Sequence, residues 1–376
     1  MGEGTRHTGR EWAHTGFAQR LHFFPGALDS VAEVVKGVGA RRVMLVTTEG
    51  RLASPAGERL WARLGRALVA TFAGVRPHVP ATAVQEAVAL ARAEDVDGLV
   101  SFGGGSCADA GKAVCFFVEQ QAGTPGMSYL DRPVVAHVAI PTTYSGAELT
   151  PFFGMTDEAA GRKSGAGGPT VAPLAAIYDP LLTMDLPPRI SAETGMNCLA
   201  HGVECAYSPR RSPEAEVLAL ACVAQTSAAL PALLVRPDDL DARSAMLAGA
   251  ALGGRCLQNA GMGVHHGLAQ LVGGRTGISH GLANAVLLAP ALRFTAEAVP
   301  VEAGRIGAAL GDPGDPAGAV DRLREGLGLP GRLSDCGVTE EDLDVVARLS
   351  QGNANVSANA RPVSEEDARA ILAAAW

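Results

Sequence analysis

Lysine is scarce in this 376-residue chain: of 31 basic residues, only Lys36, Lys112 and Lys163 are lysines. Lysine carries a compact point charge, whereas arginine carries a wide planar fork. A lysine kept in so arginine-biased a chain is therefore a candidate for a role that needs lysine itself. Lys112 and Lys163 both lie in the motif-rich stretches described below.

Other scarce features each exclude a class of protein. There is no run of basic residues and the net charge is −8, which argues against a nucleic-acid partner. No apolar run reaches the ~18 to 20 residues of a membrane helix. The first twenty residues lack the apolar core of a signal peptide. We therefore expect a cytoplasmic protein, without a membrane or nucleic-acid partner.

No CxxC pair occurs among the seven cysteines. Most lie in apolar stretches, which favours buried free thiols in a reducing compartment. Cys198 and Cys205 flank His201, so a thiolate ligand at that point is the alternative. It is disfavoured, because no second cysteine has the spacing of a metal ligand.

Strand and helix patterns alternate through the first half of the chain. The pattern predicts strands over 21–24, 42–48, 72–79, 98–102 and 134–140, of which 42–48 and 134–140 are continuous apolar runs typical of buried strands. Helical spacing between them predicts helices over 28–38, 60–71 and 81–94. This alternation is typical of an α/β fold with a doubly wound parallel sheet of the Rossmann-like type.

The pattern changes near residue 186 to long stretches rich in alanine and leucine. These predict helices over 214–234, 242–257, 281–294, 301–310, 317–327, 340–349 and 365–376. We therefore expect a flexible tail over 1–19, an α/β nucleotide-binding domain over 20–183 and an all-helical domain over 184–376. Ligands of such folds sit beyond the carboxyl ends of the strands, here in the cleft between the two domains.

A glycine-rich turn follows the predicted strand 98–102 and opens a helix. Gly103, Gly104 and Gly105 let the backbone approach a pyrophosphate, and the free N–H groups of the helix face the anion. Ser106 is predicted to cap the helix and donate to phosphate. Asp109 and Lys112 lie three apart on one face of it. We predict nucleotide binding here; the alternative is a loop without a ligand.

A second turn follows the next predicted strand, with small hydroxyl residues well placed for a nicotinamide or a ribose. Thr142 and Thr143 are candidate cofactor contacts, and Tyr144 and Glu148 are weaker candidates; the alternative is a capped turn that opens a helix. At the end of strand 42–48, Thr47 is a further candidate cofactor contact. Nearby Glu49 could meet the adenosine ribose, which favours NADH over NADPH, although a surface turn is the other interpretation.

Histidines gather in the helical part. Asn197 and His201 lie four apart, on one face of a helix, and His265, His266 and His280 follow downstream. Three imidazoles with a carboxylate at position 197 would suit Fe²⁺ or Zn²⁺, but asparagine is neutral and a much poorer ligand. Whether the site holds a metal depends on that one residue.

Taken together, these motifs resemble the iron-containing alcohol dehydrogenase superfamily. Its pattern GGGSxxDxxK is met by residues 103–112, and the likeness covers essentially residues 20–376. Within the superfamily the chain is most similar to maleylacetate reductases, through the stretches 141–157, 177–209, 262–268 and 360–376. Lys163 resembles the lysine that follows the first of these stretches.

The resemblance implies an NAD(P)-dependent oxidoreductase that moves hydride from NADH or NADPH to a small unsaturated or keto carboxylate. Maleylacetate reductases act late in aromatic catabolism, reduce a carbon–carbon double bond, look metal-independent and carry asparagine at the position of Asn197. In metal-dependent relatives the ligands fall at the positions of Asn197, His201, His266 and His280. We therefore expect no metal, a small anionic substrate and a homodimer.

The resemblance also implies roles within the site. We expect protonated His201, His266 and His280 to neutralise the developing charge and supply the proton, with Asn197 donating a hydrogen bond to the substrate. Substrate-binding candidates are Tyr144, Lys163 and His265. His137, inside an apolar strand, is predicted to be structural.

Two departures put the substrate in doubt. Maleylacetate reductases tend to read HHKLCH where this chain has glycine at 267 and glutamine at 270. After His280 they read AETHTVVLP, whereas residues 281–288 of this chain have the alcohol dehydrogenase form. A metal-dependent alcohol dehydrogenase, in which Asn197 coordinates weakly, is one alternative. A biosynthetic relative with a divergent or non-redox reaction is another.

Overall fold

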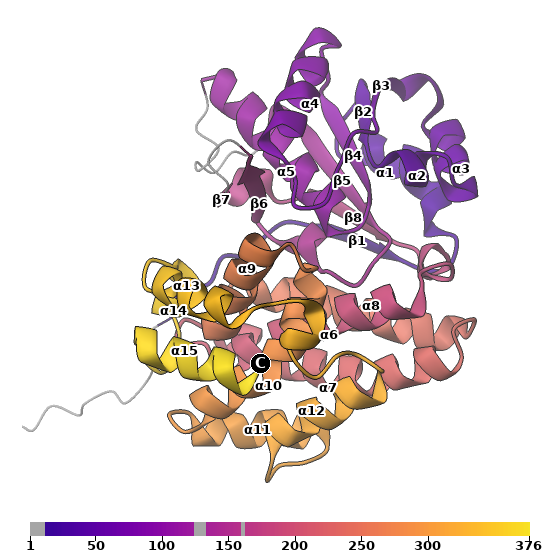
Figure 1. Ribbon diagram of the computed structural model, residues 1–376. Helices are drawn as coiled ribbons and strands as arrows, with labels where there is room; N and C mark the ends of the chain where they lie inside the picture. Colours follow the sequence, from indigo (N-terminus) through magenta and orange to yellow (C-terminus); the bar gives the residue numbers. More distant parts are fainter. Residues whose placement is uncertain (1–11, 124–132, 159–161) are drawn as a thin grey trace, which may run out of the picture.

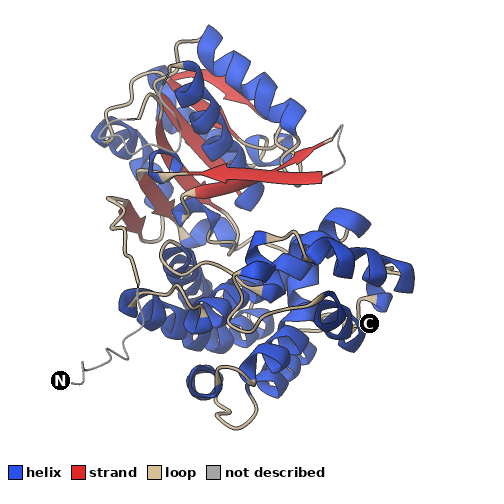
Figure 2. Ribbon diagram, turned by 90° about the vertical axis from the view of Figure 1, so that its left-hand side faces the viewer, coloured by secondary structure: helices blue, strands red, loops and turns tan. Residues whose placement is uncertain are grey.

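The computed structural model describes residues 12–123, 133–158 and 162–376, and it divides into two parts. A half built around a sheet lies on one side and a half built of helices on the other (Figure 1). The turned view shows the same division, with every strand in one half (Figure 2). The expected α/β fold followed by an all-helical region is confirmed.

Six strands form one parallel sheet, in the order β1-β8-β5-β4-β2-β3. They are β1 (Arg20–Phe23), β2 (Val43–Val46), β3 (Leu68–Phe72), β4 (Gly98–Gly103), β5 (Ala136–Pro141) and β8 (Ala175–Tyr178). The helices of this half are α1 (Val31–Gly37), α2 (Glu49–Leu52), α3 (Pro55–Leu64), α4 (Ala81–Ala93) and α5 (Gly105–Gln121). A two-stranded antiparallel hairpin, β6 (Phe152–Asp157) and β7 (Arg162–Gly167), lies apart from the sheet.

Both faces of the sheet are covered, as continuous apolar strands require. Along β2, Val43 and Leu45 belong to a core that includes residues of α1 and α3. Met44 and Val46 belong to a separate core with residues of α4 and α5. The alternation of side chains along a strand thus assigns each residue to one of two helical layers.

The strand predicted over 72–79 was misplaced. The structure ends α3 at Leu64, where Gly65 has φ +51°, and β3 then pairs with β2 from Leu68 to Phe72. Apolar residues after Phe72 belong to the loop that leads to α4. Strand β8 and the β6–β7 hairpin were not predicted, although residues 174–178 form a continuous apolar run; the hairpin is interrupted by glycines.

Residues near the amino terminus contact the helical half instead of forming a separate tail. The backbone of Thr15 exchanges two hydrogen bonds with the side chain of Asn259, at 2.7 and 3.1 Å. His14 lies 3.3 Å from the Ser212 hydroxyl. Within the predicted tail, residues 1–11 lie outside the described part of the chain.

The helical half contains ten α-helices in the described chain. They are α6 (Pro188–Tyr207), α7 (Pro213–Val235), α8 (Leu240–Leu257), α9 (Val264–Thr276), α10 (His280–Ala296), α11 (Pro300–Leu310), α12 (Pro316–Gly326), α13 (Glu340–Ser350), α14 (Ala354–Ser357) and α15 (Glu365–Ala374). Helix α6 is the central one, because it packs against α7, α8 and α10 and is buried almost throughout. The predicted boundary at residue 183 falls at the end of a short 3₁₀ turn, Pro180–Thr183.

One described helix, α7, is long and apolar enough by length and composition to cross a membrane. The expectation that no stretch reaches that length was therefore wrong. Helices in the cores of other proteins pass the same test, and α7 packs along α6 and α8. This single helix is weak evidence for a membrane.

Candidate active site

The glycine-rich turn joins β4 directly to α5. Gly103 has φ +147°, and a Cβ atom there would lie 2.5 Å from the Cys107 sulfur, so this position requires glycine. Helix α5 begins at Gly105 with Gly104 as its N-cap, and no side chain caps it. The prediction that Ser106 caps the helix is therefore wrong. Ser106 lies in the first turn, among backbone N–H groups that have no intrahelical partner.

The second predicted turn packs directly on the first. A Cβ atom on Gly104 would meet Thr143 Cγ2 at 3.1 Å, and one on Gly105 would meet Ser145 Oγ at 3.0 Å. The hydroxyls of Thr142 and Thr143 are buried without a hydrogen-bond partner. These two hydroxyls lie beside the glycine-rich start of a helix. They are therefore suitable hydrogen-bonding partners for the phosphates and ribose of a nicotinamide nucleotide.

Lys112 has a different environment from the one expected. It is fully buried, and its Nζ donates to the carbonyls of Ala147 and Phe152 and to the hydroxyl of Thr150. It also pairs with Asp109, at 2.7 Å. All of these partners belong to the protein, so Lys112 fixes the segment between β5 and β6. Direct contact of Lys112 or Asp109 with the cofactor stays a prediction that these bonds do not support.

Two other predicted contact residues are also tied up within the protein. The Thr47 hydroxyl donates to the Phe102 carbonyl at 2.7 Å and so joins the ends of β2 and β4. Tyr144 is fully buried, and Arg243 Nη1 donates to its hydroxyl at 3.2 Å. Both residues hold the loops in place.

The second turn also joins the two halves of the molecule. A Cβ atom on Gly146 would meet the backbone nitrogen of Gly254 in α8 at 3.0 Å. The turn that contacts the glycine-rich loop on one side therefore contacts the helical half on the other. This places the predicted cofactor loops at the junction between the halves.

Three helices bring the predicted histidines together. The ring centroids of His201 on α6 and His266 on α9 lie 4.8 Å apart, with the rings nearly parallel. His280, the first residue of α10, lies 5.9 Å from His266, and His265 lies 4.9 Å from it. Asn197 lies one turn before His201 on α6. The expected cluster is therefore present.

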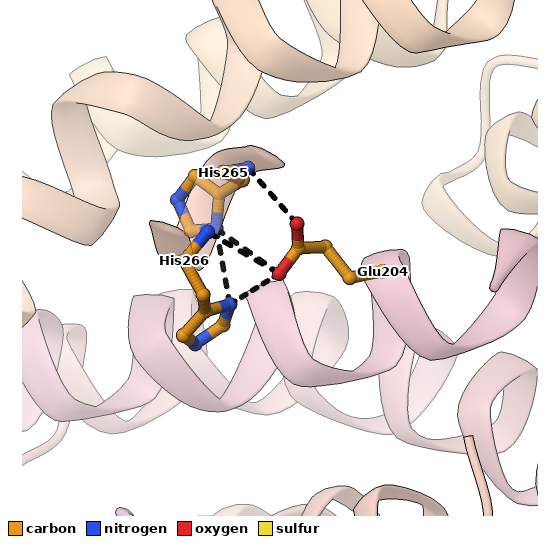
Figure 3. A group of neighbouring side chains, drawn as sticks. All are labelled: Glu204, His265 and His266. Carbon is orange, nitrogen blue, oxygen red and sulfur yellow. Dashed lines mark hydrogen bonds and ion pairs between the residues drawn. The ribbon is translucent and has the colours of Figure 1, made fainter. Parts of the chain in front are cut away.

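Glu204, which the sequence patterns did not single out, lies beside His265 and His266 (Figure 3). Its carboxylate is fully buried and accepts the backbone N–H groups of Gly263, His265 and His266 at the start of α9. It also accepts a hydrogen bond from His266 Nδ1, at 2.5 Å. One carboxylate thus fixes α9 against α6 and orients the His266 ring.

These bonds determine which nitrogen of His266 can react. Glu204 can only accept, so Nδ1 of His266 carries a proton, and Nε2 is left as the atom with free bonding capacity. His266 Nε2 is buried and has no hydrogen-bond partner, and the same holds for His201 Nδ1. His265 is different, because its Nε2 donates to the backbone carbonyl of Asn284 at 2.9 Å. His265 therefore links α9 to α10 and holds the site in place. Its predicted contact with substrate is not supported by this hydrogen bond.

Burial sets the charge of the cluster. It lowers the pKa of His201 well below its ordinary value, and it also lowers the pKa of His266, where Glu204 acts in the opposite direction. Burial would raise the pKa of Glu204, but His266 and the hydrogen bonds hold it well below its usual range. With only protein groups around them, His201 and His266 are neutral near pH 7. The expected cluster of imidazolium groups therefore needs a second anion beside Glu204 to become charged.

The residues at the family's metal position do not suit a metal well in this arrangement. The only group of three possible ligands in the described chain with atoms within 4.8 Å of one another is Glu204, His265 and His266. Its carboxylate is already saturated by N–H donors. His201, His266 and His280 do not form such a group, and Asn197 adds no negative charge. The donor set therefore lacks the anion that Fe²⁺ or Zn²⁺ sites usually have.

The first departure from the maleylacetate reductase pattern, at residues 267 and 270, lies against α14. A Cβ atom on Gly267 would meet Val356 Cγ2 at 2.5 Å, so a lysine has no room there. Gln270 accepts a hydrogen bond from Asn355, at 3.2 Å. Lys163 pairs with Thr156 in the β6–β7 hairpin, but its side chain lies outside the described part.

Sequence reasoning missed Glu204 and Asn284. A signal for Glu204 was present, because it follows Asn197 by seven residues and His201 by three and so lies on their face of α6. Asn284 donates to Asn197 Oδ1 at 3.0 Å, but nothing in the local pattern distinguishes it from its apolar neighbours.

The fold and these motifs define a class of protein, and comparison with known families agrees. The profile of the iron-containing alcohol dehydrogenases matches residues 18–180, and that of the C-terminal part of the Fe-containing alcohol dehydrogenase family matches residues 191–376. The chain belongs to the iron-containing alcohol dehydrogenase family and is an NAD(P)-dependent oxidoreductase.

Individual relatives are maleylacetate reductases. The chain is 33% identical to the enzyme of Rhizobium sp. (strain MTP-10005), over 97% of each chain. It is 35% identical to maleylacetate reductase 2 of Cupriavidus pinatubonensis, over 95% of this chain and 94% of that one. The crystal structure of maleylacetate reductase from Agrobacterium tumefaciens superposes with a TM-score of 0.86, at 32% identity, and covers 98% of this chain and 99% of that one.

Proposed function

We propose that the protein is a metal-independent reductase of the maleylacetate reductase type. It would transfer hydride from NADH or NADPH to a small unsaturated or keto carboxylate. The observation that carries this proposal is the His266 ring, whose Nδ1 is fixed by Glu204 and whose Nε2 is buried without a partner. Position 197, a metal-ligand position in relatives, holds a neutral asparagine here. From the resemblance to maleylacetate reductases, we also propose a cytoplasmic homodimer that acts in aromatic catabolism.

The bound nicotinamide supplies the hydride, and the chain's own residues manage charge and protons. The glycine-rich loop, Thr142 and Thr143 would hold the nucleotide at the junction between the halves. A carboxylate substrate brings a second anion to His266, opposite Glu204. Two flanking anions raise the pKa of an imidazole, so Nε2 takes up a proton when the substrate binds. His266 Nε2–H can then give that proton to the carbon or oxygen on which negative charge develops.

Oxidation of NADH and NADPH with a panel of carboxylate acceptors, including maleylacetate, tests this proposal. Each reaction is run with and without a chelator, and the metal content of the purified protein is measured. We expect turnover with an unsaturated or keto carboxylate that the chelator does not change. Stoichiometric iron or zinc, with activity lost to the chelator, would instead favour the metal-dependent alcohol dehydrogenase.

A further inference from the structure

Two asparagine side chains meet beside the histidines, and the chemistry of a neighbouring carbonyl fixes the orientation of both. Asn284 on α10 places its side-chain nitrogen 2.7 Å from the backbone carbonyl of His280. A backbone carbonyl can only accept a hydrogen bond. The atom of Asn284 that faces it must therefore be the NH₂ group, so the assignment of nitrogen and oxygen in this amide is not arbitrary.

The same NH₂ group then orients Asn197. Asn284 Nδ2 lies 3.0 Å from a side-chain atom of Asn197, and two NH₂ groups cannot bond each other. The atom of Asn197 at that contact must be its oxygen. Each hydrogen of the Asn284 NH₂ group has an acceptor, one on His280 and one on Asn197. The amide nitrogen of Asn197 consequently lies on the side of the amide away from Asn284.

Burial shows where that nitrogen can find a partner. Asn284 is fully buried, whereas Asn197 and His201 each retain 6% exposure on one face of α6. His280 is also partly exposed. Among the described residues, no acceptor bonds the Asn197 amide nitrogen. The donor of Asn197 therefore belongs to the small open part of the cluster.

We propose that Asn284 is a positioning residue that holds Asn197 as a hydrogen-bond donor to an oxygen of the substrate. The inference rests on the proposed function for the identity of that oxygen, and it names a second residue on which the site's preference depends. A donor at this point stabilises a negatively charged oxygen and repels a cation. The same Asn284 bond would orient a carboxylate at position 197, with one oxygen held and the other left for a metal. The residue at position 197 thus determines whether the site prefers a substrate anion or a metal cation. Asn284 holds that residue in the required orientation.

A double-mutant cycle on turnover is the first test. Asn197→Ala should lower kcat/KM by about 100-fold, as loss of a donor to developing charge does. Asn284→Ala should lower kcat/KM by about 10-fold in the native background and leave it unchanged in the Asn197→Ala background. The dissociation constant of NADH should stay the same in all variants. Equal losses in both backgrounds would mean that Asn284 only supports α10, and would overturn the proposal.

Zinc binding is the second test and needs no turnover. Calorimetry with Zn²⁺ alone should show one site in the Asn197→Asp variant, at least about 100-fold tighter than any site in the native protein. Adding Asn284→Ala should weaken that site by about 10- to 100-fold, as loss of a partner that orients a ligand does. Equal affinity with and without Asn284, or native protein that binds zinc as tightly as the Asn197→Asp variant, would overturn the inference.

The two tests separate the inference from the proposed function. If native protein turns over no carboxylate acceptor, the proposed function fails, and the zinc titrations alone decide whether Asn284 orients position 197. Circular dichroism and thermal unfolding check every variant. If Asn284→Ala does not fold, Asn284→Ser takes its place in both tests.

Discussion

Lys112 in the sheet-bearing half and the clustered histidines in the helical half are buried in opposite ways. In the sheet-bearing half, Lys112 is completely enclosed, and its ammonium group bonds two carbonyls, a hydroxyl and the Asp109 carboxylate. In the helical half, His201 and His266 are also enclosed, yet each leaves one ring nitrogen without a partner. A buried basic group with all its bonds made is part of the scaffold. Neighbouring buried groups with bonds left open indicate where a ligand belongs.

Lys112→Met tests the scaffold side of this comparison and should have the largest effect. The change removes the Nζ donor from three acceptors and from Asp109, whose side chain is 26% exposed. Each buried polar atom left unsatisfied costs about 1 to 3 kcal/mol. Urea unfolding followed by circular dichroism measures the free energy of unfolding. Lys36→Met is the matched control, because Lys36 is exposed, and it should change stability by less than about 0.5 kcal/mol. The interpretation of Lys112 as scaffold fails if both variants are equally stable.

His266→Asn tests the other side. The asparagine NH₂ group can replace Nδ1–H as donor to Glu204, while the unpaired Nε2 is lost. We therefore expect kcat to fall by about 10² to 10⁴-fold, with the free energy of unfolding and the dissociation constant of NADH largely unchanged. Stopped-flow oxidation of NADH and fluorescence titration give these quantities. Unchanged turnover would refute the catalytic role of His266. Loss of folding would mean that His266, like Lys112, is part of the scaffold.

Much of the fold could be predicted because the central strands carry continuous apolar runs. β2, β4 and β5 were found for that reason. β3 was misplaced, because apolar residues continue past Phe72 into a loop and the pattern does not show which of them pair with β2. The β6–β7 hairpin is rich in glycine and has little apolar alternation, so its pairing depends on contacts that a local pattern does not contain.

The sequence allowed us to predict which residues form the site better than what each of them does. Spacing and family motifs brought together Asn197, His201, His266 and His280. They did not show that the side chains of Lys112, Thr47 and Tyr144 form their hydrogen bonds within the protein. Such partners depend on how segments far apart in the sequence pack together. Whether a side chain belongs to the scaffold or faces the ligand is decided by tertiary structure.

Gly267→Ala tests how tightly α14 packs against α9, at the residue that follows the catalytic candidate His266. The new Cβ would lie 2.5 Å from Val356 Cγ2 and 3.1 Å from the Val356 backbone nitrogen. Overpacking of this kind costs about 1 to 3 kcal/mol, so the melting temperature should fall. Addition of Val356→Ala should recover part of the loss by removing the nearer atom. If Gly267→Ala is as stable as the native protein, α14 yields at this point and a lysine could be accommodated there.

His137 tests how far the comparison reaches, because its Nδ1 is also buried without a partner but lies within the sheet, on β5. Burial, with a smaller contribution from the charge of Lys112, lowers the pKa of His137 to about 3. The unfolded chain therefore takes up a proton below about pH 6.5 that the folded protein does not. The free energy of unfolding should fall as the pH falls from about 6.5 to 3, with His137 contributing at most about 1.4 kcal/mol per pH unit. In His137→Gln that contribution should vanish from urea unfolding curves measured across this range, while turnover near pH 7 stays native. If activity is lost instead, a single buried nitrogen without a partner indicates function by itself, even outside a cluster of such groups.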